Sequence, residues 1–138
     1  MTTVNFHEAV DDALLKYAVI VSRHKNKWVF CKHRERDTYE CPGGTREPGE
    51  DIEKTAHREL WEETGAKDYT LKKICVYAVD RNGDVRMGML YYADIKEFGE
   101  LPPSEIEKTE LFENLPESWT YPLIQPHLVA KVCEVLDI

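Results

Sequence analysis

The sequence predicts a single α/β or α+β domain in which a mixed β-sheet is flanked by helices. Several short runs rich in β-branched and aromatic residues are paired by turn signals, and two other segments show helical spacing. The 138 residues match the commonest size of one domain and contain no internal repeat, low-complexity tract or interdomain linker. We therefore expect one domain over residues 1–138.

The N-terminal part of the chain is expected to form a hairpin. Residues 1–12 are polar and acidic without a sustained period, and they predict a tail or a short irregular strand. Residues 15–22 and 27–32 are strand candidates separated by a short polar break, which indicates an antiparallel pair. Residues 39–41 are a short extended piece, and Pro42-Gly43-Gly44 is a turn that allows close approach of the backbone.

A helix and a second hairpin are expected next. Residues 51–64 favour helix, and Gly65 is placed as its C-terminal stop. Residues 69–79 and 85–95 are β-rich, and Asn82-Gly83 between them is a strong hairpin signal.

The C-terminal part should return to the sheet. Residues 98–104 predict a loop and residues 109–112 a short strand. Residues 123–136 carry apolar side chains at helical spacing, so we expect a final helix that packs on the sheet.

Composition narrows the classes of function. The net charge of -8 at pH 7 makes a nucleic-acid or anionic-lipid partner unexpected, so phosphorylated substrates would have to meet local cations or metal ions. The longest apolar runs are only a few residues, which predicts no transmembrane segment, no signal peptide and a cytoplasmic protein. The four cysteines contain no C-x-x-C pair and are expected to be reduced.

The predicted helix over residues 51–64 places carboxylates beside its apolar face. That face is a stripe of Ile52, Ala56 and Leu60. Glu59 and Glu63 fall within about 60° of the centre of the stripe, and Glu62 lies at its edge. Carboxylates beside a core are costly unless a cation compensates them, which points to Mg²⁺ or Mn²⁺, with a backbone carbonyl of Gly43 as a further oxygen ligand. On the helix alone, an acidic solvated face is an equal alternative.

The wider pattern decides between these interpretations. Gly44, Glu50, Arg58-Glu59, Glu62-Glu63 and Gly65 are spaced as in the box G-x(5)-E-x(7)-R-E-U-x-E-E-x-G-U, where U is a bulky aliphatic residue. Residues 44–66 thus resemble the Nudix hydrolase family at all seven fixed positions, a match that chance would give about once in a million chains. Ala66 is smaller than the bulky aliphatic residue usual at its position, which affects the packing at the end of the helix and not the chemistry.

The resemblance implies a Nudix-type α/β/α sandwich and assigns roles within the box. Glu59 and Glu63 would be the principal ligands of Mg²⁺ (or Mn²⁺), and Glu62 a further or water-mediated ligand. Arg58 would orient the glutamates and pair with Glu50, although its spacing to Glu62 also permits a direct pair with a purely structural role.

Several carboxylates are candidates for the general base. Glu59 or Glu63 can accept the proton of the attacking water, since metal binding lowers the pKa of that water. Many relatives place a further glutamate before an apolar pair, as Glu110 stands here before Leu111-Phe112. A solvated charge in the surrounding acidic run is the alternative for Glu110.

The resemblance also implies hydrolysis of a nucleoside diphosphate linked to another group. The short chain and its C-terminal part look like the MutT branch, whose substrates are oxidised guanine triphosphates such as 8-oxo-dGTP, and Gln125 falls near the place where that branch presents an amide to the purine. A polar residue at the start of a helix is the alternative for Gln125. Arg23, Lys32 and Arg34 are candidates for phosphate contacts or solvated charges.

Other functions remain alternatives on the sequence alone. These are a nucleotide-sensing domain with little turnover, and hydrolysis of dinucleoside polyphosphates, nucleotide sugars or capped RNA. No feature decides between a monomer and a homodimer.

Overall fold

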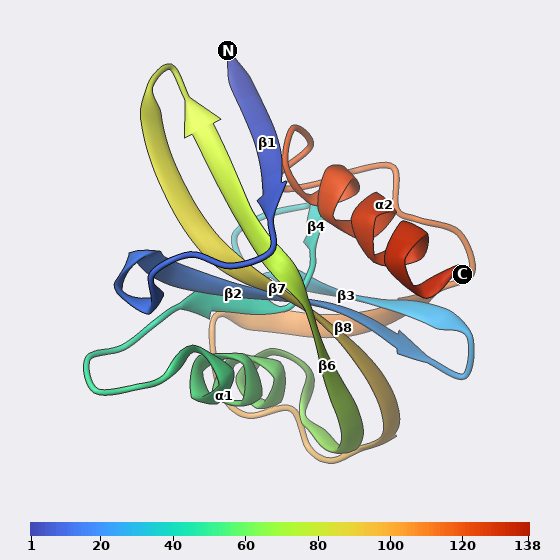
Figure 1. Cartoon of the computed structure of the whole chain (residues 1–138). Coiled ribbons are helices and arrows are strands. Elements are labelled where there is room, and N and C mark those ends of the chain that lie inside the picture. The colour runs from blue at the N-terminus through green and yellow to red at the C-terminus, as the bar shows by residue number, and fades with distance from the viewer.

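A computed structural model describes all 138 residues as a mixed β-sheet with one helix packed on each face (Figure 1). The strands are β1 (Thr2–His7), β2 (Leu15–His24), β3 (Lys27–His33), β4 (Tyr39–Glu40), β5 (Gly43–Thr45), β6 (Ala66–Arg81), β7 (Asp84–Phe98) and β8 (Ile106–Phe112). The helices are a short 3-10 turn η1 (Asp12–Leu14), α1 (Ile52–Thr64) and α2 (Gln125–Leu136). The predicted fold class is confirmed, and no helix is long and apolar enough to span a membrane.

The sheet joins both halves of the chain through one parallel pair. Its order is β1-β6-β7-β2-β3-β4, with β5 paired to β2 and β8 paired to β3. The β2–β7 pair is parallel and all other pairs are antiparallel. β2 therefore lies at the centre, where it joins the β2–β3 hairpin to the β6–β7 hairpin and also pairs with β5 after the glycine turn.

Both predicted hairpins are confirmed, and both use turns with positive φ angles. Lys25 and Asn26 have φ of 49° and 66°, and Asn82 and Gly83 have φ of 54° and 94°. Such turns match the right-handed twist of the flanking strands. The β6–β7 hairpin is longer than predicted at both ends, because its strands pair from Ala66↔Phe98 to Arg81↔Asp84.

The prediction for residues 1–12 was wrong in one respect. β1 is a regular strand, paired in register with β6 from Thr2↔Arg81 to His7↔Val76. Because β6 extends well past the sheet centre, its free edge leaves backbone groups that β1 satisfies. Similarly, β8 begins three residues earlier than the predicted short strand, where it continues to pair with β3.

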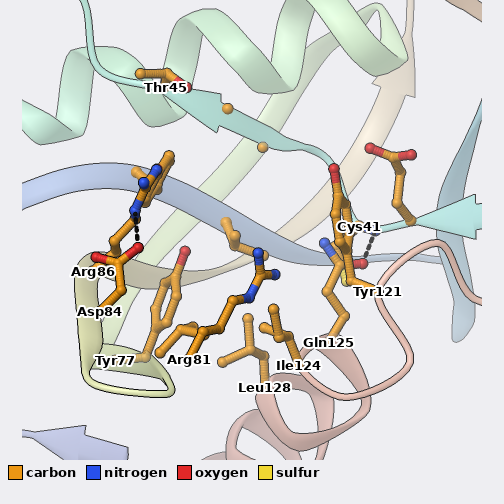
Figure 2. Close-up of a pocket in the computed structure, with 16 residues that line it drawn as sticks. Cys41, Thr45, Tyr77, Arg81, Asp84, Arg86, Tyr121, Ile124, Gln125 and Leu128 are labelled. Atoms are coloured by element: carbon orange, nitrogen blue, oxygen red, sulfur yellow. Dashed lines mark hydrogen bonds and ion pairs between the residues drawn. The ribbon is translucent and has the colours of Figure 1, made fainter. Parts of the chain in front are cut away.

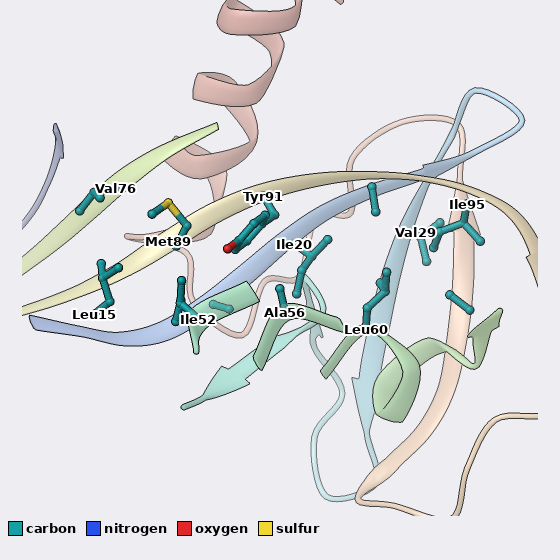
Figure 3. Packing of buried hydrophobic residues seen from close by; sticks show 13 residues of the cluster. Leu15, Ile20, Val29, Ile52, Ala56, Leu60, Val76, Met89, Tyr91 and Ile95 are labelled. Atoms are coloured by element: carbon teal, nitrogen blue, oxygen red, sulfur yellow. The ribbon is translucent and has the colours of Figure 1, made fainter. Parts of the chain in front are cut away.

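Two apolar clusters fill the space between the sheet and the helices. Figure 3 shows the larger cluster, in which α1 packs against β2 and β7. Ile52, Ala56 and Leu60 are 8%, 0% and 0% exposed, which confirms the predicted apolar stripe of α1. The second cluster lies on the opposite face, where α2 contributes Leu128, Val129 and Val132.

The ends of α1 are set by local interactions. Asp51 caps the N-terminus, since its Oδ1 accepts a hydrogen bond of 2.8 Å from the Lys54 N–H. Gly65 ends the helix with φ of 72°, as predicted, and its N–H donates to the Trp61 carbonyl. These caps fix which residues of α1 face the sheet.

Candidate active site

α1 carries its glutamates at the boundary between core and solvent. Glu59 is buried, Glu63 is partly buried, and the side chain of Glu62 is 39% exposed. Burial raises the pKa of Glu59, and it raises the pKa of Glu63 from 4.5 to about 8 with help from the charges of Glu59 and Glu40. The sheet-facing carboxylates are thus held where a negative charge is unfavourable without a cation.

The glycine turn lies directly against these carboxylates. The Gly43 N–H donates a hydrogen bond of 2.8 Å to Glu63 Oε1. A Cβ on Gly44 would lie 2.6 Å from Glu59 Oε2, so only glycine leaves room for that carboxylate. The backbone of the turn thus approaches the glutamates closely, as expected. The contact is made by the N–H of Gly43. The role of the Gly43 carbonyl as a metal ligand stays a prediction.

Arg58 connects the loop before α1 to the glutamates. Its Nε and Nη2 donate to the two oxygens of Glu50 at 2.6 and 3.0 Å, and Nη1 donates to Glu59 at 2.7 Å and to Glu62 at 3.3 Å. Arg58 lowers the pKa of Glu50 to about 2. The pair expected from the box pattern and the direct contact with Glu62 are therefore both present.

We predict that Arg58→Lys lowers kcat/KM about 10- to 100-fold. A lysine keeps the charge but has no planar fork, so it cannot hold Glu50 and Glu59 at the same time. Steady-state kinetics with a nucleotide substrate would measure the change in kcat/KM. A thermal melt would measure any change in stability separately. An unchanged kcat/KM would show that the fork does not position the glutamates.

The carboxylate oxygens of the box are the kind of ligand that a hard cation prefers, although they do not form a ready-made cluster in the protein alone. No group of three His, Cys, Asp or Glu side chains is arranged to hold a metal ion. Arg58 holds Glu59 and Glu62, while Gly43 holds one oxygen of Glu63 and the other makes no hydrogen bond. Carboxylate oxygens that are partly buried and incompletely paired suit Mg²⁺ or Mn²⁺.

A cavity of about 330 Å³ lies on the other side of β5, toward α2 (Figure 2). Its walls combine apolar side chains of β2, β6 and α2 with Tyr77, Tyr121 and Gln125. Gly43 and Gly44 line this cavity and also contact the box glutamates. The cavity therefore borders the same two glycines that contact the box glutamates.

The structure places Gln125 in this cavity and gives its amide one fixed partner. Gln125 is 5% exposed, and its Oε1 accepts a hydrogen bond of 2.7 Å from the Cys41 N–H. Because a backbone N–H can only donate, the amide oxygen must face Cys41. The amide NH₂ remains for another partner.

The three other candidate substrate contacts lie outside the cavity. Arg23 packs over Trp28 at 5.1 Å from its ring centroid, Lys32 pairs with Glu107 at 3.2 Å, and Arg34 donates to the Ser104 carbonyl at 3.1 Å. None of them lines the cavity or contacts a box glutamate. Arg23 lies near the end of β2, away from residues 17–19 that pair with β5, and Lys32 lies near the end of β3, where it pairs with Tyr39 of β4.

Glu110 is also separated from the box. Tyr39 Oη donates to it at 3.2 Å and Lys108 pairs with it at 3.0 Å. Its neighbour Thr109 donates to the Glu63 carbonyl at 2.9 Å, and adjacent strand residues point to opposite faces. Glu110 thus faces away from α1, which does not support its role as the base.

Glu40 is a carboxylate near the site that the sequence pattern did not single out. It pairs across the strands with Cys31, whose Sγ donates to the Glu63 carbonyl at 3.2 Å, so Glu40 faces α1 as well. Alternation along residues 39–41 was the available signal, since Glu40 and Cys41 must point to opposite faces just before the glycine turn. Arg81, which also lines the cavity, lies at the end of β6, beyond the strand predicted over residues 69–79.

Comparison with known proteins agrees with the box and the fold. A model of the NUDIX domain matches residues 14–123. The chain belongs to the Nudix hydrolase family. This Nudix chain is 36% identical over 104 residues to the protein "Putative 8-oxo-dGTP diphosphatase YtkD" of Bacillus subtilis (strain 168), a match that covers 75% of this chain and 65% of that relative. The match thus spans slightly less than two thirds of the relative's length.

Solved structures of Nudix proteins share the same architecture. A mutant form of the Bacillus subtilis pyrophosphohydrolase BsRppH superposes with a TM-score of 0.80 at 29% identity, over 96% of this chain and 90% of that one. A NUDIX hydrolase from Nitrosomonas europaea has a TM-score of 0.70 at 18% identity, over 87% and 89% of the two chains, and supports the fold alone.

Proposed function

We propose that this Nudix chain is a Mg²⁺-dependent (or Mn²⁺-dependent) pyrophosphohydrolase of purine nucleoside triphosphates. Water attacks one phosphorus of the bridge between the α- and β-phosphates, a P–O bond of that bridge breaks, and a nucleoside monophosphate and pyrophosphate are released. The observation that carries the proposal is the shared strand β5, which lies between the incompletely paired carboxylates of Glu59 and Glu63 and a cavity with apolar walls. The named activity of the YtkD relative supports a guanine base, oxidised or not.

The residues of the chain would divide the work between binding and proton transfer. Glu59 and Glu63, with Glu62 and the Gly43 carbonyl, would hold the ion. When bound, Mg²⁺ supplies charge neutralisation on the phosphates and lowers the pKa of a bound water. Arg58 keeps Glu59 and Glu62 in place, and Glu59 or Glu63 accepts the proton. Without a cation the pKa of Glu63 is raised to about 8, so a bound ion would also keep this carboxylate ionised and able to accept a proton near neutral pH.

A panel of nucleotides tests this function directly. We expect pyrophosphate release from dGTP, 8-oxo-dGTP or both at roughly 1–10 s⁻¹ with Mg²⁺, and none with EDTA. dATP, a dinucleoside tetraphosphate and a nucleotide sugar complete the panel, and the products are separated by ion-exchange chromatography. Binding of nucleotides without turnover of any of them would instead indicate a sensing domain.

A further inference from the structure

The main chain of Glu63 is held by side chains from two strands. Thr109 of β8 donates its hydroxyl to the Glu63 carbonyl at 2.9 Å, and the Cys31 thiol of β3 donates to the same oxygen at 3.2 Å. Thr109 and Cys31 lie directly opposite each other in the β3–β8 pair, so both side chains leave the sheet on the face that carries α1. One carbonyl of α1 thus has two donors that come from outside the helix.

This carbonyl needs an outside donor because it stands in the last turn of α1. The helix ends at Thr64, and Gly65 turns the chain with φ of 72°. Lys67, four residues after Glu63, already belongs to β6. The last carbonyls of a helix have no N–H partner within the helix. Since a thiol is a weak donor, the Thr109 hydroxyl supplies the stronger of the two hydrogen bonds to this oxygen.

The carboxylate of Glu63 has fewer supports than its neighbours in the box. Arg58 pairs with Glu59 at 2.7 Å and with Glu62 at 3.3 Å, whereas Glu63 makes no ion pair with any side chain of the protein. One of its carboxylate oxygens accepts a hydrogen bond of 2.8 Å from the Gly43 N–H. The position of this carboxylate therefore depends on one hydrogen bond and on where the last turn of α1 places its main chain.

We propose that Thr109 is a positioning residue for the metal site, and that its hydrogen bond to the Glu63 carbonyl fixes the Glu63 carboxylate relative to the other ligands. This inference rests on the proposed function, in which Glu63 is a metal ligand. A group that orients a ligand acts on ion affinity and on kcat, because both need the carboxylate in one place. Thr109 should act little on binding of the nucleotide base, since it does not line the cavity.

Thr109→Val removes the hydroxyl and keeps the shape of the side chain. In a calorimetric titration with Mg²⁺ alone, we expect the variant to bind the ion about 10-fold more weakly than the wild type. With saturating Mg²⁺, kcat should fall about 10-fold, while KM for the nucleotide stays within about twofold. Thr109→Ser keeps the hydroxyl donor and should restore affinity and kcat to within about threefold of the wild type.

Ser22→Ala is the matched control. Ser22 is 1% exposed, and its hydroxyl donates to the Ile20 carbonyl at 3.0 Å, so this variant also loses a hydrogen bond from a side-chain hydroxyl to a main-chain carbonyl. It should lower the melting temperature about as much as Thr109→Val does, and leave Mg²⁺ affinity and kcat within about twofold of the wild type. A thermal melt of each variant checks that both are folded.

Three outcomes would overturn the inference while wild-type turnover leaves the proposed function intact. They are wild-type affinity and kcat in Thr109→Val, an equal loss in Thr109→Ser, or an equal loss of affinity in Ser22→Ala. The metal titration needs no turnover, so it still decides the role of Thr109 if the protein binds Mg²⁺ and hydrolyses no nucleotide. A wild type that binds no Mg²⁺ would contradict the proposed function and this inference together.

Discussion

Glu63→Gln is expected to lower kcat at least about 10³-fold while it stabilises the protein in the absence of metal. Glutamine has the same shape and can still accept the hydrogen bond of the Gly43 N–H, now 2.8 Å from Glu63 Oε1. It cannot supply a charge to a metal ion or take a proton from water. Kinetics with saturating Mg²⁺ and thermal melts in EDTA measure the two effects on the same preparation.

The stability difference should depend on pH with a defined sign. Glu63 has a pKa of about 8 in the folded protein and 4.5 as the reference value, so the folded state binds the proton more tightly. Between these values the metal-free wild type therefore loses stability as pH rises, whereas the glutamine of the variant does not titrate. We expect the variant to be more stable by about 1–3 kcal/mol at pH 8 and nearly equal at pH 4.5. Mg²⁺ should stabilise the wild type more at pH 8 than at pH 6.

Glu53→Gln is the matched control, because Glu53 lies on the exposed side of the same helix. It should keep full activity and change the free energy of unfolding by about 0.5 kcal/mol or less. If Glu63→Gln retained turnover, or if its metal-free stability followed the same pH curve as the wild type, the assignment of a buried catalytic carboxylate would fail.

The local features of the site were predictable because short-range rules govern them. The 3.6-residue period placed Ile52 and Leu60 in the core and Glu59 and Glu63 beside them, and the glycine at position 65 ends the helix with a positive φ. The Asn82-Gly83 turn follows from the same kind of local chemistry. These parts need no knowledge of distant segments.

The features that local sequence patterns do not specify depend on partners far along the chain. β1 is a strand because β6 offers a free edge some 70 residues later, and the same pairing fixes Arg81 beside the cavity. Glu110 faces away from α1 because its register with β3 is set by pairing across roughly 80 residues. The orientation of the Gln125 amide depends on the N–H of Cys41, 84 residues before it. Strand length, register and long-range hydrogen bonds cannot be read from local periodicity.

Replacement of each glycine of the turn by alanine should separate stability from catalysis. A Cβ on Gly43 would lie 2.5 Å from the Ala18 carbonyl oxygen in the centre of the sheet. Backbone of a central strand cannot move away without loss of pairing, so Gly43→Ala should cost about 2–4 kcal/mol in the free energy of unfolding. Urea denaturation measures this cost.

Gly44→Ala should give the opposite result, with near-normal stability and a kcat about 10²- to 10³-fold lower. The new methyl group would meet the carboxylate of Glu59, the end of a flexible side chain that can turn aside. That movement would break the 2.7 Å contact between Glu59 and Arg58 and take a principal ligand out of the site. Mg²⁺ affinity, measured by calorimetry, should fall together with kcat. If Gly44→Ala kept both, the close packing of Glu59 against the turn would be a feature of the fold and not of the reaction.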